Sequence, residues 1–416
     1  MSTSILTEAE LGHAQNRIVG VLAAGQVLGG IAFGSTISLG ALLARTISGQ
    51  DALSGFATAF LTLGAALCAI PLAALAARHG RRRSLTLGNA LALVGIIVVV
   101  SAAALSWFPL LLLGFILIGA GNAGNLQSRF AATDLAPTAR RGRDLSIVVW
   151  ATTVGAVLGP NLLEPGEVIG AALGMPPLTG AYVFSIVAQL CALALYLIAL
   201  RPDPLLTAQR LALQRVVRAD HIVEVDRPRV ARYAIIAVAG SHAVMASVMA
   251  MTPVHLVHHG ATLSIVGLTI SLHVAGMYAL SPVFGILADR WGRVRVIMLG
   301  QAILAASLLT AAFAGSSEVG VTLALILLGL GWSAATVAGS ALLTEASATQ
   351  FRPKRQGRSD SLMSLSAAVG AILAGLILGW IGYGGLALVA LAVVAAVVVM
   401  SPMARIPRAA ASATVD

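Results

Sequence analysis

The stretch GILADRWGRVR, residues 285–295, joins two long apolar runs and decides how the rest of the chain is interpreted. A similar pattern stands earlier as AALAARHGRRR, residues 73–83, with Gly80 in the place of Gly292 and Ala77 in the place of Asp289. Glycines let a tight turn hold two helix ends together. The repetition predicts a chain built from two similar halves.

The composition is typical of a protein that crosses a membrane many times. Hydrophobic residues make up 58% of the 416 residues, charged residues make up 10%, and the mean hydropathy is +0.93. A soluble domain carries about 25% charged residues. Only helices and closed barrels satisfy their backbone hydrogen bonds inside a bilayer, and these apolar runs are too long and too uniform for barrel strands. We therefore expect an all-α membrane protein.

Twelve apolar runs are long enough to span a bilayer, for which about 18 residues suffice. They form two groups of six, which predicts an N-terminal half over 1–200, a linker over 201–230 and a C-terminal half over 231–416. The linker is basic and has helical periodicity in part. The expected spans are 18–44, 52–77, 84–105, 108–131, 145–172, 178–200, 231–257, 264–288, 296–314, 319–345, 361–380 and 384–402.

Basic residues gather on one side of this expected topology. Only Arg45 of the 26 lysines and arginines falls on the other side. By the positive-inside rule, the basic side faces the cytoplasm together with the linker and both termini. Topology thus accounts for the formal net charge of +10, and we expect no nucleic-acid partner.

The loop after the eighth expected span resembles a family signature. The motif G-x-x-x-D-R-x-G-R at 285–293 is similar to the cytoplasmic loop of the major facilitator superfamily, and the resemblance extends to span count, orientation and the six-plus-six repeat. It implies a monomeric carrier that works by alternating access. Asp289 can cap a helix N-terminus or pair with an arginine across the interface of the halves. With Ala77 at the matching position, the first-half loop would be the weaker latch.

A second motif in the fifth expected span, Gly155-x-x-x-Gly159-Pro160, resembles the glycine-proline motif of proton-coupled drug exporters in this superfamily. Small residues permit close helix packing and proline bends a helix. The sequence NLLEPGE replaces the glycine pair that usually follows, so a simple packing kink is an equally good interpretation. The residues to which these resemblances give a gating role are Gly285, Asp289, Arg290, Gly292, Arg293, Gly80, Arg81, Gly159 and Pro160.

Sequence features for catalysis are missing. Nothing resembles a nucleophile–base pair, a phosphate-binding loop or a nucleotide fold, so we expect neither an enzyme nor a resident cofactor. Acidic residues stand only near the ends of the expected spans. The interior of the first half offers neutral polar side chains such as Gln26 and Asn125. No carboxylate is therefore expected deep in the membrane.

Methionine and histidine recur in the seventh and eighth expected spans. Met245 and Met249 are one helical turn apart, as are His273 and Met277, so each pair lies on one helix face. At 1.5 Å per residue, the pairs start about 21 Å and about 22 Å from the same end of the molecule. Thioether and imidazole suit a soft or borderline cation such as Cu(I), although methionines also serve as ordinary core filling. His242 lies one turn before Met245 and is a further candidate ligand. Three more histidines would collect metal at the outer mouth, and they are His255, His258 and His259.

The two motifs together are similar to those of the CcoA-like copper importers, a bacterial branch of the superfamily. The resemblance implies import of copper across the inner membrane, with Met245, Met249, His273 and Met277 as ligands. It also implies supply of copper to haem-copper cytochrome oxidase and release to a cytoplasmic copper chaperone or another thiolate acceptor.

Members of that branch also use cysteine thiols. Cys68 and Cys191 are therefore candidates, although both fit equally well as small apolar filling.

Three other functions remain open. A proton-driven drug exporter would account for the glycine-proline kink and the apolar interior. An importer of an organic solute such as riboflavin would resemble relatives that lack the methionine and histidine motifs. A copper receptor that transports nothing would use the basic linker to contact a cytoplasmic partner.

Overall fold

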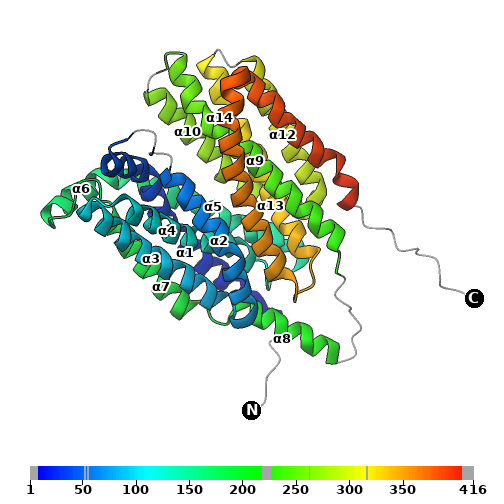
Figure 1. The fold of residues 1–416 in the computed structure, drawn as a ribbon. Coiled ribbons are helices and arrows are strands. Elements are labelled where there is room, and N and C mark those ends of the chain that lie inside the picture. The colour runs from blue at the N-terminus through cyan, green and yellow to red at the C-terminus, as the bar shows by residue number, and fades with distance from the viewer. Residues whose placement is uncertain are drawn as a thin grey trace, which may run out of the picture.

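Helices make up nearly all of the chain that the computed structural model describes, which is residues 8–50, 53, 56–217, 226–261, 263–314 and 317–404. They fall into two groups, and Figure 1 shows the helices up to α7 on one side and those from α9 onward on the other. The bounds of the expected halves and of the linker stay predictions.

The first half contains seven helices, two of which divide one expected span. They are α1 (Glu8–Ser48), α2 (Phe56–His79), α3 (Arg81–Leu105), α4 (Phe108–Ala131), α5 (Arg141–Asn161), α6 (Leu163–Ala172) and α7 (Tyr182–Ala199). The second half contains α9 (Pro228–His258), α10 (Leu263–Tyr278), α11 (Ser281–Trp291), α12 (Arg293–Phe313), α13 (Glu318–Glu345) and α14 (Arg352–Val399). The short 3₁₀ turns η2 (Thr138–Arg140) and η3 (Ser401–Ala404) precede α5 and follow α14.

Ten helical segments in the described part of the chain are long and apolar enough to cross a membrane. The last, Arg352–Ala404, has 53 residues and leaves helical geometry at Gly382, whose φ is 71°, so it contains both the eleventh and the twelfth expected spans. The expected fifth span, 145–172, is not among the ten, and the chain there divides into α5 and α6. The count of twelve spans and the orientation of the termini stay predictions.

Small residues set how closely the helices approach. A Cβ added to Gly64 of α2 would lie 2.1 Å from the carbonyl oxygen of Ile116 on α4, and one added to Gly300 of α12 would lie 2.8 Å from the amide nitrogen of Ala335 on α13. Close backbone approach of this kind is how membrane helices gain packing energy without a hydrophobic driving force between them. Gly155 has the same role, since its added Cβ would lie 2.6 Å from the Val27 carbonyl oxygen on α1.

The start of α14 differs from the expected start of the eleventh span. The helix begins at Arg352 rather than at 361, with Pro353 in its first turn, where proline is favoured. The polar sequence RPKRQGRSD is therefore helical and not a loop. As a result Asp360 lies inside the helix with no exposed surface, which corrects the expectation that no carboxylate is buried there.

The linker is helical in part, as its periodicity indicated. Helix α8 (Pro204–Val217) packs against α2 and α3, with Leu205 and Ala208 buried, and residues 218–225 lie outside the described residues. At the far end of the linker, Asp226 accepts two hydrogen bonds from Arg355 of α14 at 2.6 and 2.7 Å. These bonds hold the pKa of the Asp226 carboxyl below its ordinary value.

Candidate substrate site and the gate beside it

Helix α13 orients the histidine of the predicted site. The His273 Nδ1 atom lies 2.8 Å from the Leu325 carbonyl oxygen, which can only accept, so Nδ1 donates and the lone pair of a neutral imidazole is on Nε2. His273 is completely buried, and its Nε2 atom has no hydrogen-bond partner in the described part of the chain. A ring fixed by a backbone carbonyl, with the other nitrogen free, is the usual arrangement of a histidine that ligates a metal.

The turn that carries His273 and Met277 is pressed directly onto α13. A Cβ added to Gly329 would lie 2.5 Å from the His273 carbonyl oxygen and 2.9 Å from the Met277 amide nitrogen. Only glycine fits there, so the backbone of α10 is held at a fixed height on α13.

The methionines share one buried cluster. Met245 of α9 and Met277 of α10 are 4% and 7% exposed and belong to the same hydrophobic cluster as Leu325 and Trp332 of α13, and Met249 packs against it. Helices α9 and α10 are consecutive but make little direct contact with each other. Helix α10 packs mainly against α13, whereas α9 packs mainly against α14 and also against α13, so the two motifs share α13 as a neighbour.

His242 has a different environment. The Trp332 Nε1–H donates a hydrogen bond of 2.8 Å to its Nδ1 atom, so a neutral His242 carries its own proton on Nε2 and has no free lone pair. The Trp332 ring also packs edge-on against Tyr278, with ring centroids 5.8 Å apart. His242, Trp332 and Tyr278 thus form an aromatic group beside the methionines.

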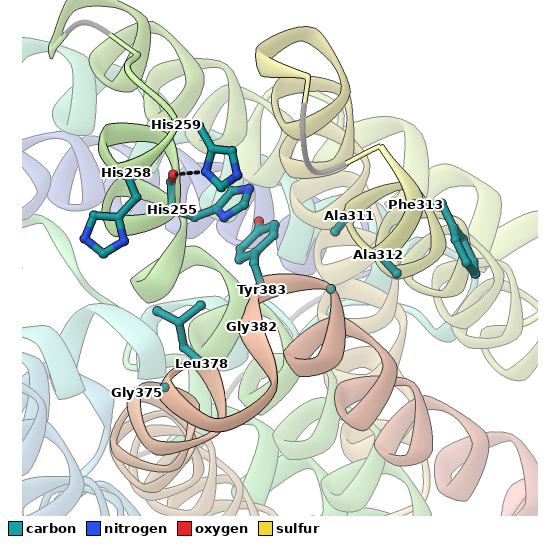
Figure 2. A pocket seen from close by; sticks show the side chains of 12 residues that line it. His255, His258, His259, Ala311, Ala312, Phe313, Gly375, Leu378, Gly382 and Tyr383 are labelled. Carbon is teal, nitrogen blue, oxygen red and sulfur yellow. Dashed lines mark hydrogen bonds between the residues drawn. The ribbon is translucent and has the colours of Figure 1, made fainter.

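The three outer histidines do not come together. They border a pocket of 640 Å³ between α9, the end of α12 and the bend of α14. Figure 2 shows the rings of His255 and His259 beside Tyr383, whereas His258 points away from them. His255 stacks on Tyr383 with centroids 4.2 Å apart, and within the described residues no three His, Cys, Asp or Glu side chains gather as a metal site. The three rings do not all point the same way, because nearby positions on a helix end face in different directions, and their role in collecting metal stays a prediction.

The cysteines lie away from this cluster. Cys68 is a partly buried residue of α2 that packs with the small apolar residues of that helix and of α4. Cys191 is an exposed residue of α7. Both thiols are free.

The loop between α11 and α12 contacts the first half at the end of the molecule that carries the linker and most arginines. We call this end the basic end. Asp289 accepts hydrogen bonds from the backbone N–H groups of Gly142 and Arg143 at 3.0 and 2.8 Å, and so caps α5 of the other half. It also forms an ion pair of 2.6 Å with Arg293, and Arg293 donates to the Thr138 carbonyl oxygen at 2.7 Å. The expected cap across the interface is confirmed, while the arginine partner comes from the same half. We call these contacts the Asp289 latch.

The loop between α2 and α3 uses different residues at the basic end. Arg81, fully buried, pairs with Asp134 at 2.8 Å and donates to Gln356 of α14 across the interface. Gln356 in turn donates to Thr344 at 3.2 Å. We call these contacts the Arg81 latch. Gly80 and Gly292 have φ values of 90° and 98° at the two corresponding turns, which explains why both must be glycine.

Sequence reasoning missed Asp134, Gln356 and Asp360. A second repeat could have pointed to the right region, because Arg140-x-Gly142-Arg143 and Arg355-x-Gly357-Arg358 match each other near the starts of α5 and α14. The gating role of the other predicted residues stays a prediction. Arg290 is an exposed residue in the last turn of α11, and Gly159 and Pro160 lie near the end of α5.

Comparison with known proteins gives a consistent assignment of the fold. Residues 22–268 and 234–415 each match the Major Facilitator Superfamily. Among solved structures, the human organic anion transporter MFSD10 superposes with a TM-score of 0.75 at 18% identity, covering 94% of this chain and 99% of that one. A bacterial homologue of the iron transporter ferroportin, in its outward-facing state, has a TM-score of 0.70 at 15% identity and covers 92% and 98%.

Three sequence relatives are more similar. YddS of Bacillus subtilis, named an uncharacterized MFS-type transporter, is 37% identical over 373 residues, which is 87% of this chain and 85% of the relative. YdeG of the same organism, with the same kind of name, is 36% identical and covers 88% and 87%. The riboflavin transporter RfnT of Brucella anthropi is 32% identical over 385 residues and covers 88% and 91%.

Proposed function

Since this chain belongs to the major facilitator superfamily, we propose that it is a secondary transporter that imports copper by alternating access. The proposed ligands are Met245, Met249, His273 and Met277. The observation that supports this cargo is the His273 imidazole, with Nδ1 on a backbone carbonyl and Nε2 buried without a partner. Two of the three methionine ligands are members of the buried cluster that surrounds this region.

The physical reason is the cost of an unsatisfied polar atom. A buried acceptor without a partner costs about 1–3 kcal/mol, which a bound cation would offset. Thioethers are neutral at every physiological pH, so they bind Cu(I) without releasing protons and without the strength of a thiolate. A carrier needs such moderate affinity, because it must release its cargo to an acceptor that binds copper more tightly.

His242 is engaged differently and would join the ligand set only after its bond to Trp332 breaks. The outer pair His255 and His259 would pass the ion inward. We expect the basic end to face the cytoplasm and a bacterial inner membrane to be the location.

An organic cargo is the second candidate. The likeness to a riboflavin transporter favours it, and so does the group formed by His242, Tyr278 and Trp332. Aromatic side chains of this kind stack on planar ring systems. This candidate predicts uptake that copper chelators leave unchanged and that loss of the methionines hardly affects.

The test is copper uptake by cells that express the chain, measured as cell-associated copper over time. Changing the four proposed ligands to alanine together should reduce the saturable uptake by at least about tenfold, since each lost ligand removes a sizeable part of the binding free energy. Met251→Ala is the matched control, because Met251 packs against the same cluster from α9 without belonging to either motif. Equal copper uptake by the parent and the quadruple variant would end the copper proposal. Riboflavin uptake by the same cells distinguishes the second candidate.

A further inference from the structure

A buried ion pair joins the two halves at the basic end. The Arg129 Nη2 atom of α4 lies 2.5 Å from the Asp360 Oδ1 atom of α14, so the pair connects the N-terminal half to the C-terminal half. Asp360 has no exposed surface and Arg129 is 3% exposed. An ionisable pair buried in a membrane-spanning helix is expensive, and it normally marks a function.

The pair is only half satisfied. The Asp360 Oδ2 atom and the Arg129 Nε atom have no hydrogen-bond partner among the residues that the structure describes. A carboxylate with one oxygen on a guanidinium and the other unpartnered has a vacant position for a proton. Arg129 also lies 3.9 Å from the Met363 sulfur, one turn further along α14.

The charges around Asp360 come from few helices. Arg129 of α4 and Arg81 of α3 are the cations that act on it. Ala66 and Ala69 of α2 contact α14 on either side of Asp360. Cys68 lies between them in the sequence and is the ionisable residue of α2 in this region. The ionisable groups on α9 are Arg229, Arg232, Tyr233, His242, His255 and His258, those on α10 are His273 and Tyr278, and those on α13 are Glu318 and Glu345, of which Glu345 pairs with Arg293. Helix α12 packs beyond the Gly382 bend of α14.

Alternating access makes this pair unusual. When the basic end opens, α4 and α14 separate because they belong to different halves. Breaking a buried ion pair leaves an uncompensated charge on each side, which is strongly destabilising. Placing a proton on the carboxylate removes one of the two charges, so the separated state is favoured by protonation.

We propose that Asp360 is a proton-binding residue, and that the opening of the basic end is linked to the uptake of one proton by its Oδ2 atom. The proton comes from water as the halves separate, converts the carboxylate to a neutral carboxyl group, and returns to water when Arg129 re-forms the pair. This proposal supplies a coupling ion for the carrier and does not depend on the identity of its cargo. For a single linked proton, the ratio of open to closed molecules changes by at most about tenfold per pH unit.

The test measures the distance between the halves without any cargo. Arg83 and Arg295 are exposed at matching positions of the two loops, so spin labels on Arg83→Cys and Arg295→Cys report the opening of the basic end. Cys68→Ser and Cys191→Ser remove the native thiols in every sample. Pulsed electron resonance distances are recorded in lipid nanodiscs at about pH 5.5 and about pH 8.5.

We expect the open fraction of the parent to rise several-fold at the lower pH. Asp360→Asn, which is neutral at both pH values, should be open to the same raised extent at both, and Asp360→Glu should restore the pH response with a shifted midpoint. Asp226→Asn is the matched control, because it removes the partner of Arg355 within one half, and it should follow the parent.

Two results would overturn the proposal. One is a parent whose open fraction does not change with pH. The other is an Asp360→Asn variant that keeps the parent's pH response. If Asp360→Asn does not fold, Asp360→Glu decides, because an unchanged midpoint would show that the titrating group lies elsewhere. Neither result would bear on copper, which is absent from all samples.

Discussion

The two latches at the basic end start from similar loops and reach the opposite half in different ways. In the Asp289 latch, one carboxylate accepts from two backbone N–H groups of α5. In the Arg81 latch, Ala77 stands in the place of that acid, and the contact is made between the side chains of Arg81 and Gln356. The buried pair of Arg129 and Asp360 lies on the same side of the molecule as the Arg81 latch, on α4 and α14.

The helix that each loop faces explains the difference. Helix α5 begins at Arg141, so the amides of Gly142 and Arg143 lie in its first turn and need a partner from outside the helix. Helix α14 begins at Arg352, more than one turn before Gly357, so the amides at the corresponding positions are used within the helix. A carboxylate therefore has donors to bind in one latch and none in the other, and side chains carry the second contact.

The largest expected effect is that of Asp289→Asn. The amide accepts one of the two backbone hydrogen bonds and loses the ion pair with Arg293. Hydrogen bonds to charged groups contribute about 1.5–3 kcal/mol each, so we expect the closed state to lose about 3 kcal/mol, or on the order of 100-fold in the ratio of open to closed molecules. The spin-label distance across the basic end measures this shift.

The control for this change is Glu318→Gln. Glu318 lies in the first turn of α13, at the opposite end of the second half, and its loss should leave the distance distribution unchanged. If Asp289→Asn also kept the parent distribution, the cap on α5 would not hold the basic end closed, and the distinction between the latches would fail.

Close glycine contacts also distinguish the two latches, and changing them has the next largest expected effect. A Cβ on Gly285 would lie 2.4 Å from the carbonyl oxygen of Gly142, whereas a Cβ on Gly357 would lie 2.4 Å from the Cβ of Ala73. Overpacking costs about 1–3 kcal/mol, so Gly285→Ala and Gly357→Ala should each favour the open state by about 5- to 100-fold. The distance measurement applies again.

Rescue distinguishes the two glycines. Ala73→Gly removes the atom that collides in Gly357→Ala and should restore most of the closed population, although the Ala69 carbonyl oxygen remains 3.0 Å away. No side-chain truncation removes the backbone atom that collides in Gly285→Ala, so Ser146→Ala should fail to restore it. Equal rescue of both would mean that the closed contacts differ from those described.

The features that the sequence predicted are those encoded by local pattern. Apolar runs predicted the helices, and the repeated loop predicted the two halves and the cap made by Asp289. The packing of both α9 and α10 against α13 was not predictable, because it depends on contacts between residues far apart in the sequence, such as Gly329 against the turn of His273 and Met277. The early start of α14 is not predictable from local pattern, because its charged residues are satisfied by partners outside the helix: Arg352 by the Ser347 carbonyl oxygen, Arg355 by Asp226 and Asp360 by Arg129. The proposed ligand set still rests on the two motifs, with the His273 hydrogen bond as the structural addition.

The smallest expected effect comes from Ala77→Asp, which places the missing acid in the Arg81 latch. If the acid alone made the difference between the latches, this change should close the basic end as firmly as Asp289→Asn opens it. The early start of α14 predicts otherwise, because a carboxylate at residue 77 finds no free backbone N–H near Gly357.

The remaining partner for a carboxylate at residue 77 is Arg81, four residues later in the chain, just as Arg293 is four residues after its partner Asp289. Arg81 is already paired with Asp134, so the added carboxylate competes for an occupied guanidinium and gains little. We expect a change below about 1 kcal/mol, or less than about fivefold in the ratio of open to closed molecules. A shift toward closure as large as the one lost in Asp289→Asn would show that α14 does offer free donors, and that residue 77, not the start of the facing helix, sets the strength of a latch.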